Sequence, residues 1–430
     1  MATDVLEAPA PSIAIAPPRR MRPAVYAAAL VLAAGLIAGY AWHYWPSRRF
    51  AAALRLIDSN AEEPLLYASL GFHGLALEPE QSILNAHFAL RGGRPMQAIH
   101  ELEPAWDCPR THWRALVMSG AAWSNLGRLK DATVAWETAL KDDDQIELHR
   151  ALAAAYFDLG AIGATQYHLE RWIEQSPGDP RPHRMMAKIY RDFERLVEAA
   201  EHYEIVLRAV AQNPALERFV PDVPEILVEW ASCLAHLGKY DTALEALSTS
   251  DPTAEVLAIQ AECYFAEGEH DKAAEAVRGA LAQAPNYLPA LLLQIDLALD
   301  QRRTDEALDF AQRAVAAYPT DSLSRQRLGQ VYQRLGKADQ AEAELEKMDE
   351  LKELRLWFTE LHERAAERPY DADVRYELGQ VAEKLTWGEL AADWYNAALK
   401  IDPDHQKAHE ALEVLYQQTY DQGDRHADSK

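Results

Sequence analysis

The chain has 430 residues and a formal net charge of −24 at pH 7, because 67 acidic side chains outnumber 43 basic ones. A chain this acidic repels polyphosphate backbones, so its composition argues against a nucleic-acid partner. The sequence also lacks the short motifs of phosphate-binding loops, zinc proteases, serine hydrolases and dinucleotide-binding folds. We therefore expect no catalytic residue, no metal and no cofactor.

The first predicted element is a membrane helix at residues 24–45, an uncharged run long enough to span a bilayer. Arginines flank it on both sides, and Trp42, Tyr44 and Trp45 lie where an interfacial aromatic belt is typical. We expect a disordered tail at 1–23 before it and a juxtamembrane helical segment at 46–80 after it. The alternative is a cleaved signal peptide, whose apolar stretch would be unusually long.

The basic residues on the two sides of this run are nearly balanced, so they do not decide its orientation. A short tail rich in Ala and Pro, followed by a large folded domain, is typical of a signal anchor. We expect a single-pass protein of the cytoplasmic (inner) membrane of a bacterium, with the rest of the chain on the periplasmic side.

A pattern recurs about every 34 residues between 81 and 404. Gly120, Trp123, Gly127 and Ala132 show its elements, which are a small residue, an aromatic residue, a glycine and an alanine. Each copy predicts two short helices that pack at small side chains, the first ended by glycine. The alanine column then marks about nine helical hairpins: Ala98, Ala132, Thr165, Ala199, Ala243, Ala273, Ala307, Ala341 and Ala391.

The copy from Leu116 to Leu140 resembles the tetratricopeptide repeat (TPR), whose pattern is W-x2-L-G-x2-Y followed by A-x3-F and P. The resemblance implies an all-α, right-handed superhelical solenoid at 81–404 with an inner groove that receives peptides. We expect a capping helix at 405–420 and a disordered tail at 421–430. Glu194, Arg302 and Thr386 replace the glycine of the turn, so we expect looser or differently angled hairpins there.

The first helix of one copy carries cations at helical spacing, on the face that the resemblance turns toward the groove. A cationic stripe in an acidic solenoid could bind an acidic client, because Arg offers paired donors to a carboxylate. The alternative is a solvated face whose charges pair with local acids, and the Lys and Asn of the family's carboxylate clamp are not found. The candidate partner-binding residues are Arg181, Arg184, Lys188 and Arg191, with Arg150 and Phe157 on the preceding repeat.

Few residues could form a disulfide or bind a metal. Cys108, Cys233 and Cys263 are odd in number and lack a C-x-x-C spacing, so buried free thiols are expected, with a disulfide between the last two as the alternative. His405 and His409 lie four apart on the expected capping helix and could reach one metal. Two ligands do not define a site, and a solvated helix explains them equally well.

Residues 339–368 contain neither Gly nor Pro, which predicts an overlong helix. Its apolar residues follow spacings of three and four, as in a heptad seam. The seam either packs against the next hairpin or offers a docking edge for self-association with a second chain. The seam residues are Leu351, Leu354, Phe358, Leu361 and Ala365.

These features together predict a membrane-tethered interaction scaffold or assembly factor that binds a protein or peptide client through the groove. Two alternatives stay open. One is a chaperone-like carrier of exported or cofactor-requiring clients, and the other is a structural subunit of a membrane complex.

Overall fold

The computed structural model describes residues 78–427, and every regular element in that range is a helix. The expected tail at 1–23, the membrane span at 24–45 and nearly all of the segment at 46–80 lie outside the described residues. Among the helices that are described, none has both the length and the apolar character needed to cross a membrane.

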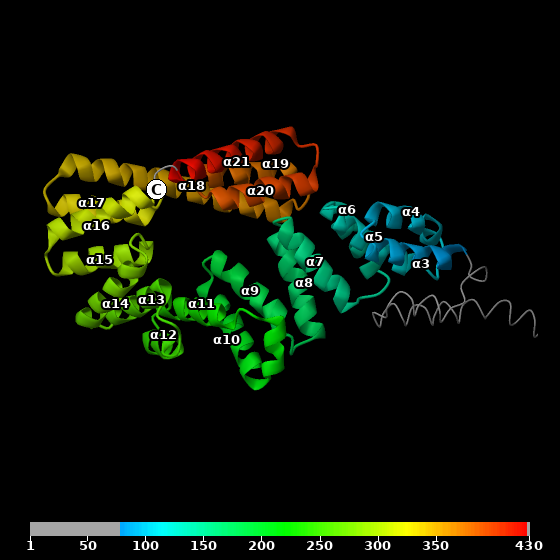
Figure 1. The fold of residues 1–430 in the computed structure, drawn as a ribbon, viewed down its shortest axis with the longest axis horizontal. Helices are drawn as coiled ribbons and strands as arrows, with labels where there is room; N and C mark the ends of the chain where they lie inside the picture. The colour runs from blue at the N-terminus through cyan, green and yellow to red at the C-terminus, as the bar shows by residue number, and fades with distance from the viewer. Residues whose placement is uncertain (1–77, 428–430) are drawn as a thin grey trace, which may run out of the picture.

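The predicted all-α repeat solenoid is confirmed, because consecutive helices in the described range pair as nine hairpins (Figure 1). The short 3₁₀ helix η1 (Pro214–Phe219) precedes the fifth hairpin, and α21 (Gln406–Ala427) follows the ninth. The paired helices are α3 (Glu78–Arg91) and α4 (Pro95–Trp106), α5 (His112–Asn125) and α6 (Leu129–Leu140), α7 (Ile146–Asp158) and α8 (Ile162–Gln175), α9 (Pro180–Asp192) and α10 (Leu196–Gln212), α11 (Val223–His236) and α12 (Tyr240–Leu247), α13 (Ala254–Ala266) and α14 (His270–Gln283), α15 (Leu288–Asp300) and α16 (Thr304–Ala317), α17 (Ser322–Arg334) and α18 (Ala338–Glu367), and α19 (Ala372–Lys384) and α20 (Gly388–Ile401).

The alanine column is buried in every hairpin, and all nine of its residues are at most 2% exposed. Small residues on the first helix receive an aromatic ring from the second. A Cβ added at Gly120 would lie 2.3 Å from Nε1 of Trp136, and one added at Gly379 would lie 2.4 Å from Cε1 of Tyr395. Trp136 also donates from Nε1 to the Val117 carbonyl at 3.1 Å, which fixes the ring in the gap.

The turns between paired helices keep one geometry whether or not they contain glycine. Turn glycines such as Gly127 have φ between 66° and 80°, and Glu194, Arg302 and Thr386 adopt 57° to 59° at the equivalent position. The closing hydrogen bond is also kept, because the amide of Arg195 donates to the Tyr190 carbonyl at 2.8 Å, as in the glycine turns. The three turns are therefore no looser than the glycine turns, since these residues adopt the left-handed backbone instead, while a different angle between the paired helices stays a prediction.

The overlong helix is α18, with 30 residues from Ala338 to Glu367. Its first part pairs with α17, while Leu361 and Ala365 are fully buried in a cluster with Val374 and Leu378 of the next hairpin. The seam therefore packs within the chain, as the first of the two alternatives predicts. Self-association through 339–368 stays a prediction.

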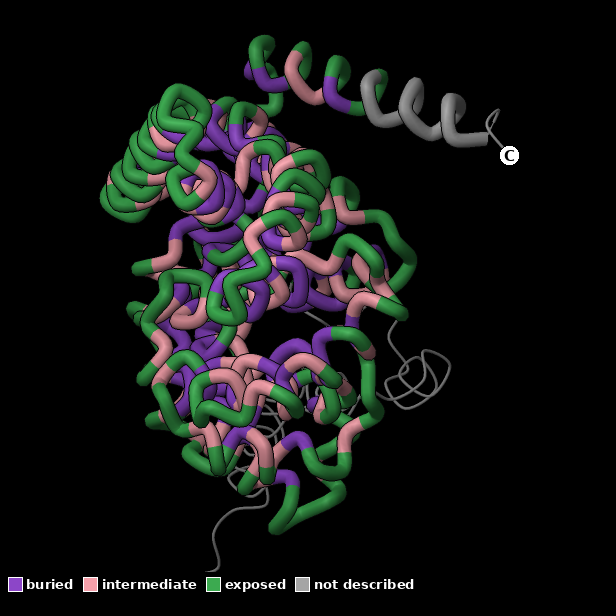
Figure 2. The backbone as a smooth tube through the Cα atoms, turned by 90° about the vertical axis from the view of Figure 1, so that its left-hand side faces the viewer, coloured by how far each residue is buried: buried purple, intermediate pink, exposed green. Residues whose placement is uncertain are grey.

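Because α18 is so long, it carries the chain back toward its earlier repeats. In Figure 1 the ninth hairpin returns toward α6 to α8, and α18 packs on α8 while α20 packs on α6. The repeats from the second hairpin to the ninth thus close into a ring, and the first hairpin extends away from it. Figure 2 shows the buried positions running through the body of this ring, with α21 projecting from it.

Candidate partner-binding site at the ring closure

Arg375 lies at the centre of the closure and is fully buried. Its Nε donates to the Leu159 carbonyl at the end of α7 at 3.0 Å, and its Nη2 donates to the Ala365 carbonyl of α18 at 3.0 Å. Helix ends leave such carbonyls without partners, so one guanidinium satisfies the ends of two helices that lie far apart in sequence. Burial lowers the pKa of Arg375 to about 10, which leaves the side chain charged at neutral pH.

Close packing and one ion pair complete the contact on the α20 side. The Trp394 ring lies against Gly160, where an added Cβ would be 2.3 Å from Cζ3. Lys400 Nζ lies 3.8 Å from Asp158 Oδ2 across the same boundary. These contacts join the turn between α7 and α8 to α20.

A chain of hydrogen bonds reaches the closure from inside the third hairpin. The Tyr370 hydroxyl lies 3.1 Å from both the Tyr156 hydroxyl and Thr133 Oγ1, and Tyr156 donates to Glu137 Oε1 at 3.2 Å. Glu137 in turn bonds His168, and that hydrogen bond is the main cause that lowers the pKa of the Glu137 carboxyl. The loop between α18 and α19, which carries Tyr370 and is called the Tyr370 loop below, is therefore held by a partly buried polar network of the second and third hairpins.

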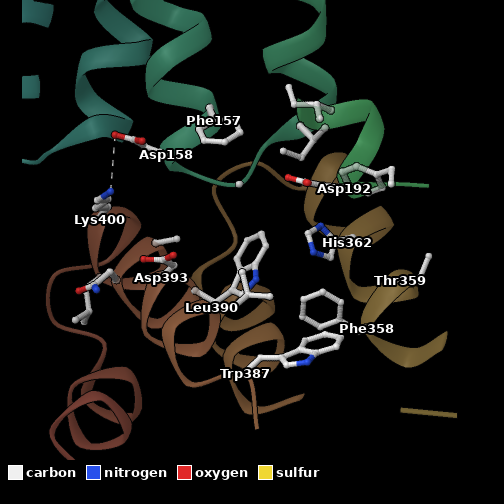
Figure 3. A pocket seen from close by; sticks show the side chains of 18 of the residues that line it. Phe157, Asp158, Asp192, Phe358, Thr359, His362, Trp387, Leu390, Asp393 and Lys400 are labelled. Atoms are coloured by element: carbon white, nitrogen blue, oxygen red, sulfur yellow. Dashed lines mark ion pairs between the residues drawn. The ribbon is translucent and has the colours of Figure 1, made fainter. Parts of the chain in front are cut away.

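A cavity of about 1490 Å³ opens beside these contacts. Figure 3 shows its two walls facing one another, with Phe157 and Asp192 on one wall and Phe358 and Trp387 on the other. The first wall is formed mainly by the ends of α7 and α9 and by the turns that follow α5, α7 and α9, and the second mainly by α18, α20 and the turn before α20. Its lining is mainly apolar and aromatic, with charges of both signs, which is typical of a binding pocket.

An aromatic cluster links the two walls around His362 of α18. The His362 ring meets Phe193 at 5.4 Å, Phe358 at 4.7 Å and Trp394 at 4.8 Å between centroids, each in an edge-to-face arrangement. Desolvation by burial, and then the charge of Arg375, lower the pKa of His362 to about 4. The imidazole is neutral at pH 7 and packs as an aromatic ring.

The structure places the cationic stripe of α9 against acids of the next repeat. Arg184 lies 2.7 Å from Asp222 and 2.8 Å from Glu229, and Arg191 also pairs with Glu229. Because Glu229 is half-buried between the two arginines, their charge is largely neutralised within the protein. This arrangement fits the alternative of locally paired charges.

The other candidate residues have different surroundings. Arg150 and Arg181 both lie within 4 Å of Asp179, and they stack on the Trp172 ring at 4.9 and 5.1 Å. Lys188 is exposed and forms no ion pair with a described residue. Phe157 is the candidate that lines the cavity, where it is 40% exposed.

The three cysteines and the two histidines spaced four apart are the candidates for a disulfide and for a metal site. Cys108, Cys233 and Cys263 are free, so the disulfide alternative is not formed; the last two are buried and Cys108 is half-buried. His405 lies 3.3 Å from Asp373, whereas His409 bonds the Pro403 carbonyl, so the two rings have separate partners. Within the described range, no group of three or more potential ligands could hold a metal ion.

Sequence reasoning missed Arg375, Tyr370, Trp394 and the cavity. A signal for Arg375 was present, because it lies three residues before Leu378 and seven before Ala382, on the face that the repeat pattern buries. A charged residue at a position that the repeat pattern buries indicates that a hydrogen-bond or ion-pair partner is buried with it. The pattern does not say which distant repeat supplies that partner.

Three family models match parts of the chain. The model described as ChAPs (Chs5p-Arf1p-binding proteins) matches residues 225–357, and two tetratricopeptide repeat models match residues 184–254 and 372–405. Each model covers less than half of the chain. A search of curated proteins finds no match.

Several solved structures match the chain at low identity and low TM-score. A MamA protein is 20% identical over 41% of this chain and 94% of its own, with a TM-score of 0.30. TTC0263, a thermophilic TPR protein of Thermus thermophilus, is 21% identical over 45% and 98%, with a TM-score of 0.28. The APC/C hetero-tetramer Cut9-Hcn1 is 14% identical over 87% and 84%, with a TM-score of 0.33.

TM-scores of this size do not establish a shared overall arrangement. Two segments of the chain match tetratricopeptide repeat models. The described residues show nine hairpins, a buried small-residue column and a turn geometry common to the hairpins, which together form a helical-repeat solenoid with TPR-like repeats.

Proposed function

We propose that this chain is a non-enzymatic interaction scaffold that binds a segment of a protein client. A TPR-type helical repeat fold favours protein binding, and the ChAPs model is named for proteins that bind other proteins. The observation that carries the proposal is the cavity at the ring closure, which combines volume, aromatic lining and access from the surface.

The cavity favours a client segment with a large apolar or aromatic side chain. Phe157, Phe193 and Leu356 offer exposed apolar surface at its walls, and such surfaces commonly mark interaction sites. Lys352 of α18 supplies a cation at the second wall, which suits an acidic residue next to the anchor, whereas the neighbouring Arg355 lies 3.8 Å from Asp321. We place client binding in this cavity rather than along the α9 stripe, because the stripe's arginines already pair with Asp222 and Glu229.

The test replaces aromatic surface at the first wall. Phe157→Ala combined with Phe193→Ala removes two exposed rings of the cavity and should reduce crosslinking of the native client at least tenfold. Val134→Ala with Ile205→Ala is the matched control, because both side chains are similarly exposed but lie outside the cavity. Equal crosslinking of both double variants, measured by quantitative mass spectrometry of native membranes, would contradict a client site in the cavity.

We further propose that residues 24–45 tether the scaffold to the cytoplasmic membrane, with the repeats on the periplasmic side. Support comes from the length and apolar character of this run, since burying about 20 such residues in hydrocarbon is effectively irreversible.

Carbonate washing should therefore leave the full chain in the membrane pellet, whereas a shortened chain starting at Ala51 should be released. Protease added to spheroplasts should digest the repeats. Release of the intact chain by carbonate would contradict the tether, and complete protection from protease would contradict the periplasmic side.

The same crosslinking distinguishes a carrier from a structural subunit. A carrier should release its client and be recovered with substoichiometric amounts of it. A structural subunit should instead co-purify with one membrane complex at fixed stoichiometry.

A further inference from the structure

The walls of the cavity belong to repeats that lie far apart along the chain. The first wall ends at Glu194, and the second wall is supplied mainly by residues from Lys352 onward. Neither wall encloses the space without the other, as the facing arrangement in Figure 3 shows. The cavity is therefore complete only while the ring is closed.

The contact that closes the ring is narrow compared with the contacts inside the solenoid. Each hairpin packs on its neighbours along whole helices, whereas the closure joins the turn after α7 and parts of α6 and α8 to α18, α20 and the Tyr370 loop. The ion pair in it, between Asp158 and Lys400, is largely exposed and contributes little. In a solenoid each repeat depends mainly on its neighbours, so separation of this contact would not by itself unfold the hairpins.

We infer that the closure is a reversible latch, and that a client segment bound between the two walls holds the ring closed. The role of the client segment rests on the proposed function, whereas the latch itself does not. A segment that touches both walls can make all of its contacts only when the ring is closed. Its binding therefore shifts the equilibrium between the open and the closed ring toward the closed form. Opening the ring, conversely, divides the site and releases the segment.

Gly160 allows the latch to be weakened by a substitution that removes no aromatic side chain from either wall. Its φ is +67°, and a side chain there would overlap the Trp394 ring. Asn tolerates this left-handed backbone better than most residues, so Gly160→Asn should act mainly through that overlap. Gly268→Asn is the matched control, because Gly268 has a φ of +80° in an equivalent turn and nothing within 4 Å of an added Cβ.

Gly163 and Ala366 allow the latch to be locked and its closure to be measured. A Cβ added at Gly163 of α8 lies 4.0 Å from Cβ of Ala366 in α18, within the range that a disulfide requires. Cysteines at both positions should oxidise rapidly only while the ring is closed. Cys108→Ser removes the native thiol that is half-buried and could compete, and the other two thiols are buried.

The closing experiment uses the full-length chain in detergent. A mild oxidant should form the Gly163→Cys/Ala366→Cys disulfide at least tenfold more slowly when Gly160→Asn is present, and at an unchanged rate with Gly268→Asn. Far-UV circular dichroism should show unchanged helicity in all variants. A disulfide rate that Gly160→Asn does not change, or a loss of helicity parallel to the slower rate, would overturn the latch.

A blocked Leu-benzoylphenylalanine-Leu tripeptide then serves as the photoreactive probe of the cavity. Labelling of residues on both walls should increase in the oxidised, locked protein and decrease several-fold with Gly160→Asn. Equal labelling of the first wall in the locked and weakened proteins would overturn the coupling between binding and closure. Labelling of neither wall in any variant, with disulfide rates as expected, would instead contradict the proposed client site and leave the latch in place.

Discussion

Gly120 and Trp136 illustrate how single residues set the spacing within a hairpin. The absence of a side chain at Gly120 lets the Trp136 ring lie against the backbone of the first helix, and Ala132 sits one turn before that ring with no exposed surface. Interiors are packed as densely as organic crystals, so the position tolerates little added volume.

Gly120→Ala should therefore destabilise the protein by about 1–3 kcal/mol through overpacking, although Ala is the better helix former. Gly163→Ala is the control, because a Cβ there meets nothing closer than 4.0 Å and should be neutral or slightly stabilising. Urea unfolding followed by circular dichroism measures both. A Gly120→Ala variant as stable as Gly163→Ala would contradict the packing described for this hairpin.

Arg302 shows the backbone strain that arises when another residue takes the place of the turn glycine. It adopts a φ of 57°, where a side chain contacts its own backbone unfavourably, and its amide still closes the turn on the Leu299 carbonyl.

Arg302→Gly should raise the free energy of unfolding by up to about 1 kcal/mol, because glycine adopts this backbone without steric cost. Gly268→Ala in an equivalent turn should lower it by a similar amount. Thermal melting of the pair tests the argument. A decrease in melting temperature for Arg302→Gly would show that the arginine side chain contributes more than the strain costs.

At the scale of elements, α18 connects the ninth hairpin to the fourth. One of its faces packs on α19 and α20, while His362 contacts the turn after α9. His362 stays neutral there because burial lowers its pKa to about 4, from 6.5 for an exposed histidine. His183, inside the fourth hairpin, is shifted in the same direction by burial and then by His202.

Acid should destabilise the protein through these histidines. A depressed histidine pKa means that the unfolded chain binds protons more readily, so stability is complete above pH 6.5 and is lost as the pH falls toward 4. A shift of this size corresponds to about 3 kcal/mol for His362 at the acid limit.

His362→Phe should reduce the loss of stability between pH 7 and pH 4.5, measured by urea unfolding at each pH. His236→Phe is the control, because His236 is exposed on α11 and should leave the profile unchanged. The same acid sensitivity in His362→Phe and in the unmodified protein would contradict this role for the imidazole.

At the scale of the whole molecule, ring closure converts a row of hairpins into a structure with an internal boundary. Arg375 and Tyr370 contact residues of the third hairpin, more than 200 positions earlier, and the cavity follows the same boundary. A solenoid normally presents one continuous surface, whereas closure adds a site shared by repeats that lie far apart along the chain.

The sequence by itself determined the hairpins, the buried small column, the position of each turn and the length of α18. These features depend on residues within about one repeat of each other, so the order of small, aromatic and glycine residues is enough to predict them. The tertiary structure alone decided that Arg184 and Arg191 share Glu229, that Arg375 reaches Leu159, and that Phe157 faces Trp387 across a cavity. Each of these contacts depends on the rotation between successive repeats, and small rotations accumulate around the ring into a geometry that no single repeat encodes.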